Sequence, residues 1–145
     1  NTAGTSAGAI CLNMRELTSL VEGSEININF EGVNIHDNTA AQDGGAVMMT
    51  YDNSKVDVNL NINSCTINNN NATAGNGGGI YCQVGPISGD DPSPNVDVTK
   101  CKVNLNGGTI SNNHANAACG GGVYVKNLPI YFLSAPQIST FLAKK

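Results

Sequence analysis

One pattern of residues recurs from end to end of the chain, and this repeat constrains the fold more than any other feature. Each copy has a reference isoleucine, with an apolar residue five positions earlier and, in three copies, an asparagine three positions later. The reference residues are Ile35, Ile67, Ile110 and Ile138; the earlier apolar residues are Phe30, Ile62, Leu105 and Leu133. Nine or ten residues after each asparagine, a glycine-rich stretch leads into an apolar pair. Self-similarity of this kind indicates a solenoid.

Within each copy, apolar and polar residues alternate. Apolar residues occupy every second position of 26–30 and of 56–62, with Asn or Asp between them. A period of two predicts strands that bury one face. A second short apolar segment and a third, after the glycines, predict three strands per repeat.

These features predict an all-β fold, a single-stranded parallel β-helix of about four coils with three short strands in each. We expect it to be right-handed, like most large three-sided β-helices. One domain should cover 1–145, with coils at approximately 1–37, 38–69, 70–112 and 113–145. The reference isoleucines and the earlier apolar residues would then form core columns. We expect an asparagine column at one corner, formed by Asn1, Asn38, Asn70 and Asn113, because asparagine tolerates left-handed backbone and its amides can stack in hydrogen-bonded ladders.

The pairing of an apolar-x-x-Asn motif with Gly-Gly-(Ala/Gly)-(Val/Ile) resembles the repeats of chlamydial polymorphic outer membrane proteins and related autotransporter passengers. Residues 35–47 (IHDNTAAQDGGAV) carry the resemblance most completely. Ile stands where that family usually has Phe, and two copies read Gly-Gly-Gly. The resemblance implies a surface-exposed or secreted solenoid with an adhesive or structural role, and it does not imply a particular receptor.

Composition argues against nucleic acid as a partner and against membrane insertion. Charged residues make up 12% of the chain, against the usual ~25% for soluble domains. The net charge is −4 and Arg15 is the one arginine, so no basic stripe is available to displace counterions from a phosphate backbone. No apolar stretch approaches the ~20 residues that span a bilayer.

The five cysteines are spaced irregularly and form no metal-ligand motif. By the alternation, Cys65, Cys82 and Cys101 point into the core, where a thiol behaves as a small apolar residue. The alternation predicts that the side chain of Cys11 points outward, and Cys119 directly precedes the last glycine run. A disulfide between coils is the alternative, and an extracellular setting would permit it.

The residue pattern also predicts no enzyme, no cofactor and no metal site. Catalytic β-helices need clustered carboxylates for acid–base chemistry or for Ca²⁺. Asp57 and Asp97 lie between inward-facing valines and therefore point outward as solvated residues. His36 and His114 fall at different offsets of the repeat, with no acid or nucleophile at a fixed position beside them.

Carbohydrate binding or degradation, as a module of a larger secreted protein, is the alternative function. Tyr81 and Tyr124 share an outward column and form the candidate ligand face, together with the loops at 51–55 and 84–95, although packing against a neighbouring segment explains the tyrosines equally well. Asn71 opens the sequon Asn71-Ala72-Thr73 and is a candidate N-glycosylation site, where we expect a glycan to project freely from the corner.

The two ends of the predicted stack carry the main functional prediction. An uncovered end coil presents unpaired backbone groups and an open apolar section, which solenoids usually cover with a polar repeat or a helix. We expect Asn1 and Thr2 at one end to meet Ile138 and Phe141 at the other, with Phe141 at the next asparagine position. The sequence thus predicts a non-enzymatic structural or adhesive solenoid, extracellular or at the cell surface. It would stack head to tail on a second copy, or on flanking β-helix of a longer parent, as a filament subunit or a stalk segment.

Overall fold

The computed structural model describes residues 1–15, 17, 19–52, 55–85, 96–128, 130–134, 137–138 and 141–144. Regular structure consists of short strands and one 3-10 turn, η1 (Val98–Lys100). The strands of the first two coils are β1 (Thr2–Ala3), β2 (Ile10–Met14), β3 (Glu25–Glu31), β4 (Asn34–His36), β5 (Thr39–Ala40), β6 (Val47–Tyr51), β7 (Asp57–Asn63) and β8 (Thr66–Asn68). The later strands are β9 (Asn71–Ala72), β10 (Ile80–Val84), β11 (Cys101–Asn106), β12 (Thr109–Ser111), β13 (His114–Ala115), β14 (Val123–Lys126), β15 (Ile130–Ser134), β16 (Gln137–Ile138) and β17 (Phe141–Lys144).

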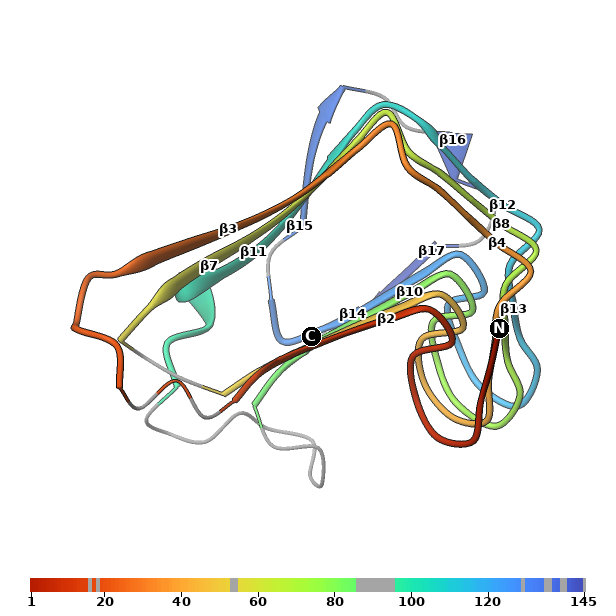
Figure 1. The fold of residues 1–145 in the computed structure, drawn as a ribbon, viewed down its shortest axis with the longest axis horizontal. Helices are drawn as coiled ribbons and strands as arrows, with labels where there is room; N and C mark the ends of the chain where they lie inside the picture. Colours follow the sequence, from red (N-terminus) through yellow and green to blue (C-terminus); the bar gives the residue numbers. More distant parts are fainter. Residues whose placement is uncertain are drawn as a thin grey trace.

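These strands stack into four parallel sheets, and successive coils of the chain lie over one another (Figure 1). We name the sheets by their order of strands: sheet A is β1-β5-β9-β13, sheet B is β2-β6-β10-β14-β17, sheet C is β3-β7-β11-β15 and sheet D is β4-β8-β12-β16. The arrangement confirms the predicted parallel β-solenoid. It has four strands per coil where the sequence predicted three, because the corner after each ladder asparagine forms a two-residue strand of its own.

The core columns follow the repeat until the last coil. Sheet D pairs the reference isoleucines in the order Ile35, Ile67, Ile110 and Ile138. In sheet C, Phe30 pairs with Ile62 and Ile62 with Leu105.

The predicted place of Leu133 at the end of this column is wrong. Leu105 pairs with Phe132, and Asn106 pairs with Ser134. Leu133 is the extra residue of a β-bulge, a local insertion that the chain absorbs without losing the register of the following strand. Counting back five positions from Ile138 therefore falls one residue short of Phe132.

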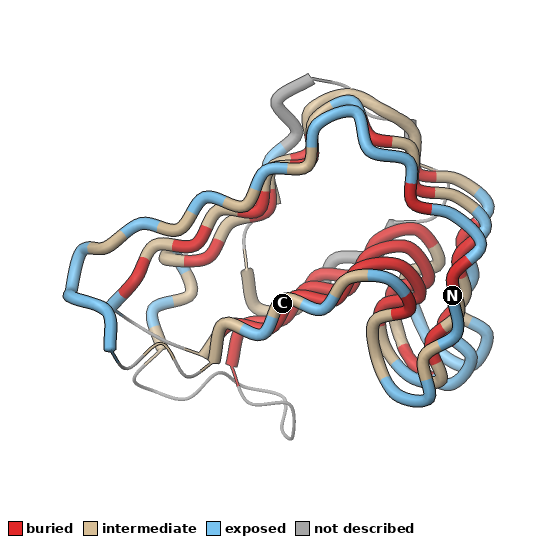
Figure 2. Tube along the Cα trace, viewed as in Figure 1, coloured by how far each residue is buried: buried red, intermediate tan, exposed pale blue. Residues whose placement is uncertain are grey.

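The middle coils bury most of their apolar side chains (Figure 2). Leu60, Ile67, Ile80 and Val103 have no exposed surface. Cys65, Cys82 and Cys101 are buried and Cys11 and Cys119 are exposed, as the alternation predicts, and all five thiols are unpaired, so the alternative of a disulfide between coils is wrong.

The sequence analysis gave one asparagine at each corner two roles, left-handed backbone and hydrogen bonding. At each corner before sheet A, two adjacent residues share these roles. Asp37, Asn69 and Asn112 take the left-handed conformation, with φ of 54°, 54° and 53°. The ladder asparagines follow them and are not among the positive-φ residues. Left-handed backbone is tolerated best by Gly, Asn and Asp. The Asp or Asn at the first position therefore forms the turn, and the asparagine that follows it forms the hydrogen bonds of the ladder.

The last strand departs from the predicted path. β17 pairs with β14 in sheet B, with Phe141 beside Val123, so the prediction that Phe141 takes the next asparagine position is wrong. Between Ile138 and Phe141 the chain has neither an asparagine nor a glycine run to build the corner and the turn. It therefore passes from sheet D to sheet B and leaves β13 as the last strand of sheet A.

Candidate functional site

A buried ladder of asparagine amides runs through the corner of the stack. The Nδ2 of Asn1 donates to Oδ1 of Asn38 (3.1 Å), that of Asn38 to Oδ1 of Asn70 (2.9 Å), and that of Asn70 to Oδ1 of Asn113 (2.9 Å). The backbone N–H groups of Asn38 and Asn70 donate to the same acceptors, both at 3.0 Å. Asn70 has no exposed surface, and Asn38 and Asn113 are 4% and 3% exposed. The asparagine column of the sequence analysis is thus a ladder in which Asn1, Asn38 and Asn70 each donate to the asparagine of the next coil.

The ladder also fixes the strands beside it. Nδ2 of Asn70 donates to the carbonyl oxygens of Ile35 (3.1 Å) and Asn68 (2.9 Å), and Nδ2 of Asn113 donates to that of Ile67 (2.8 Å). Buried polar groups are costly unless they are paired, so these bonds make the ladder specific for asparagine.

A glycine-rich loop folds over the outer face of sheet B. Backbone hydrogen bonds align Ala7, Gly44, Gly77 and Gly120, and all four have φ between 61° and 70°. A Cβ at Gly44 would lie 2.9 Å from Cβ of Met48, and one at Gly120 would lie 2.8 Å from Cβ of Tyr124. At Gly44 and Gly120 both the backbone conformation and the close approach to the sheet therefore favour glycine, whereas the first coil has Ala7 at this position.

Under this loop, Tyr81 and Tyr124 stack with ring centroids 5.4 Å apart and planes 4° from parallel. They are 5% and 6% exposed and form an apolar cluster with Met48, against which Ala7 packs. The Tyr81 hydroxyl donates to Oε1 of Gln83, and burial raises the pKa of Tyr81. The prediction of an exposed ligand face is wrong, because the glycine-rich loop covers these rings.

The loop regions proposed for carbohydrate also begin in the core. Tyr51 has no exposed surface, and its hydroxyl donates to the carbonyl oxygen of Val56 at 2.6 Å. Val84 is fully buried as well. Residues 53, 54 and 86–95 lie outside the described residues.

Sequence reasoning missed a second polar ladder beside the glycines. Oδ1 of Asp43 accepts from the backbone N–H of Asn76 (2.7 Å), and Oδ1 of Asn76 accepts from the backbone N–H of Cys119 (3.1 Å). These residues precede the positive-φ glycines, and an Asp or Asn before a glycine run was the signal that could have found them.

A third ladder lies on the outer face of sheet C. Nδ2 of Asn61 donates to Oδ1 of Asn29 (2.8 Å), and Nδ2 of Asn104 donates to Oδ1 of Asn61 (2.7 Å). In the sequence these asparagines appeared only as the polar residues that alternate with the apolar ones. Their amides pair from coil to coil and occupy the surface that a ligand would have to contact.

The candidate glycosylation residue Asn71 lies in β9, between Thr39 and His114 of the neighbouring strands. Its Oδ1 is buried and has no hydrogen-bond partner among the residues that the structure describes, while the Thr73 hydroxyl donates to the carbonyl oxygens of Ala40 and Ala41. Asn71 is half-buried, and its strand is paired on both edges, so its use as a glycosylation site stays a prediction.

Charged and titratable residues form pairs on the surface. His36 Nδ1 lies 2.7 Å from Oδ2 of Asp37, and Lys100 Nζ lies 3.1 Å from Oδ2 of Asp57. Hydrogen bonds from the Thr99 side chain and backbone lower the pKa of Asp97. Among the described residues, no three His, Cys, Asp or Glu side chains gather closely enough to bind a metal ion.

The first coil forms one end of the stack, and its apolar side chains are incompletely covered. Ile26, Ile28 and Phe30 of β3 are half-buried, whereas their partners Val58, Leu60 and Ile62 are at most 2% exposed. Ile10, Leu12 and Met14 of β2 show the same contrast with β6. Asn1 and Thr2, two of the predicted junction residues, lie at this end on the outer edge of sheet A.

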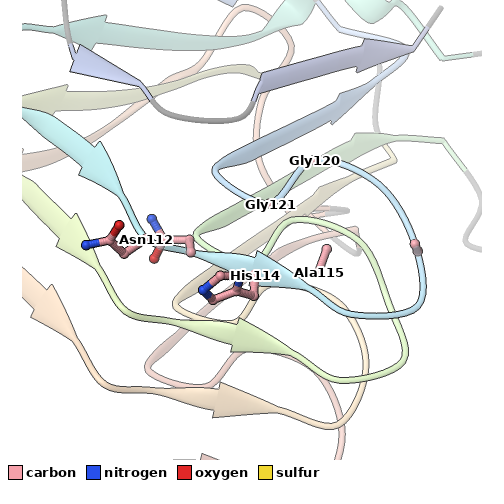
Figure 3. Close-up of a pocket in the computed structure, with 7 residues that line it drawn as sticks. Asn112, His114, Ala115, Gly120 and Gly121 are labelled. Atoms are coloured by element: carbon pink, nitrogen blue, oxygen red, sulfur yellow. The ribbon is translucent and has the colours of Figure 1, made fainter.

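The opposite end carries Ile138 in β16, Phe141 in β17 and a shallow cavity of about 490 Å³ beside β13 (Figure 3). The cavity is lined by Asn112, Asn113, His114, Ala115, Ala118, Gly120 and Gly121. Asn113 forms the last rung of the asparagine ladder. No described residue accepts its backbone N–H or continues the ladder from its Nδ2.

Residues 64–83 match the model of the Chlamydia polymorphic membrane protein repeat. The match covers one copy of the repeat, from the left-handed Ser64 through Asn70 and the glycine run to β10, one coil beyond the segment whose sequence resembles the family most fully. No curated protein and no solved structure matches the chain. In the part of the chain that the structure describes, no helix has the length and apolar character to cross a membrane. The segment 64–83 is therefore similar to the Chlamydia polymorphic membrane protein repeat.

Proposed function

We propose that this chain is a non-enzymatic structural solenoid of an extracellular or cell-surface protein, which extends by stacking its first coil on another β-helical coil. The observation that carries the proposal is the half-exposed apolar section of the first coil. Side chains that are fully buried one coil later are left partly uncovered there, and another coil of the same section would cover them.

Three further observations support this role. The polymorphic membrane protein repeat at 64–83 favours a surface location. Hydrogen-bonded amides occupy the outer face of sheet C and a folded loop covers that of sheet B, so the described residues of these two faces present no exposed aromatic pair for a sugar. Sheet edges at both ends offer backbone groups for strand addition. A contact between two different ends does not close into a ring, so repeated contacts of this kind give a linear assembly.

Ile28→Lys tests the proposal. Ile28 is half-buried at the open end, so a lysine can extend into solvent in a single chain, but it would place a charge in the stacking surface. Sedimentation velocity over a concentration series should show association of the unaltered chain and a loss of association in Ile28→Lys. Asn27→Lys adds the same charge to the exposed outer face of β3 and is the matched control. Equal association of Ile28→Lys and the unaltered chain would refute stacking through the first coil.

A further inference from the structure

The cavity beside β13, which we call the slot, lies at the end of sheet A, where the next segment of the repeat would stack. One coil earlier, the corresponding space is filled by the strand and glycine turn of the next coil: a Cβ at Gly78 would meet the backbone of His114 and lie 2.5 Å from the carbonyl oxygen of Gly121. Asn113, His114 and Gly121 now line the cavity, with no coil above them among the described residues. The slot therefore has the shape that accepts an Asn-x-Ala strand followed by a close-packed glycine.

The hydrogen-bond donors of Asn113 indicate what the slot would bind. Its side chain is 3% exposed and lines the cavity, and its backbone N–H and one Nδ2 hydrogen have no acceptor among the described residues. At Asn70 the same two groups donate to a single Oδ1 in the next coil. An asparagine side-chain oxygen in the equivalent position would complete the pattern.

The first segment of the chain supplies these features. Asn1-Thr2-Ala3 repeats Asn38-Thr39-Ala40, and Gly8 aligns with Gly45 in the glycine turn. In a second copy, Oδ1 of Asn1 would accept from Asn113, Thr2 and Ala3 would pair beside His114 and Ala115, and Gly8 would lie over Gly121. These relations reproduce those of β13 with β9 within the chain, where Oδ1 of Asn113 accepts from Asn70.

The end of sheet B opposes that docking. β17 pairs with β14 in the same register in which β2 pairs with β6, so Phe141 stands where Ile10 of a second copy would stand. Figure 1 shows β17 continuing the stack formed by β2, β10 and β14. Sheet A is open at this layer and sheet B is filled, so a second copy can seat its first strand but cannot follow it with β2.

We infer that β17 is a removable cap, and that the slot beside β13 takes the Asn1–Gly8 segment of a second copy when β17 leaves sheet B. This inference rests on the proposed stacking function. It adds a gate to that function, because β17 has to leave sheet B before a second copy can stack. Release of β17 exposes the edge of β14 for the incoming β2, so the asparagine ladder and sheet B then extend together.

Two variants of the full chain test the gate. The first ends at Ile138 and lacks the cap. The second, Lys126→Cys with Lys144→Cys in a Cys11→Ser and Cys119→Ser background, joins β17 to β14 when oxidised, because these positions are register partners and neighbouring strands lie about 4.8 Å apart, within disulfide range. Its reduced form is the matched control. Circular dichroism establishes that each variant is folded.

Sedimentation velocity should show the chain ending at Ile138 associating at roughly tenfold lower concentration than the full chain. The oxidised double-cysteine variant should associate more weakly than its reduced form. Association that is indifferent to both the deletion and the disulfide would overturn the gate and leave the stacking function standing. Absence of association in every form, including the chain without β17, would overturn the gate and the stacking function together.

Discussion

The Oδ1 of Asn70 accepts two hydrogen bonds from Asn38, one from its Nδ2 at 2.9 Å and one from its backbone N–H at 3.0 Å. A single buried oxygen thus connects a side chain and a backbone of the preceding coil. Because the relation recurs between Asn70 and Asn113, the ladder specifies the register of sheet A, whose strands are only two residues long.

Substitution of the central rung should destabilise the fold. Asn70→Ala removes the acceptor of two Asn38 donors and leaves the carbonyl of Ile35 without its side-chain donor, so we expect a loss of about 2–4 kcal/mol in the free energy of unfolding. Urea denaturation measures the loss. Asn61→Ala, in the outer ladder of sheet C, is the control and should cost about 1 kcal/mol or less. Equal losses would mean that the buried ladder has no special role.

The glycine turn should reject a methyl group at one position and accept it at another. Gly78→Ala would drive a Cβ against the backbone of His114 and Gly121, which cannot move without shifting two coils, so we expect destabilisation of about 3 kcal/mol or a failure to fold. Gly4→Ala is the matched control, since nothing lies within 4 Å of its Cβ position. Thermal unfolding compares the two, and a mild effect at Gly78 would contradict the packing of the turn.

The two tyrosines under the loop should behave as core residues. Tyr124→Ala removes a stacked ring that is 6% exposed, and we expect it to cost about 3 kcal/mol. Tyr131→Ala removes a side chain that is 44% exposed and should change stability by about 0.5 kcal/mol or less. Denaturant unfolding checks the difference. A near-neutral Tyr124→Ala would instead indicate that the loop does not hold the rings.

Alkaline pH should destabilise the native state through a buried thiol. Burial raises the pKa of Cys101 from its ordinary 9.0 to about 12. Between these values the unfolded chain releases the thiol proton and the folded chain keeps it, so stability falls as pH rises. Cys101→Val lacks this group, and its free energy of unfolding should fall less steeply by about 1.4 kcal/mol per pH unit. Parallel slopes for the two proteins above pH 9 would contradict the buried position of Cys101.

The fold was readable from the sequence because each coil repeats the same local requirements. Alternation in 26–30 and 56–62 predicts the strands of sheet C, and the recurring isoleucine and asparagine predict which residues stack on which. The prediction failed where the structure departs from the repeat: the bulge at Leu133 changes the spacing by one residue, and β17 lies in sheet B, whereas the repeat predicted the next asparagine position for Phe141.

The surface was harder to predict. Alternation shows whether a side chain points into the core or away from it, but it does not show which segment lies over that side chain. Tyr81 and Tyr124 do point away from the core, but the glycine-rich loop folds back on them. The glycines were visible in the sequence as a tight turn. Their left-handed φ and their contact with sheet B appear only when the path of the loop in space is known.

The most direct test of the stacking account is negative-stain electron microscopy of the chain over a concentration series, with the variant that ends at Ile138 beside it. The account predicts unbranched particles one β-helix thick that lengthen with concentration, earlier in the variant without β17. Dispersed single particles of both proteins at every concentration would contradict it.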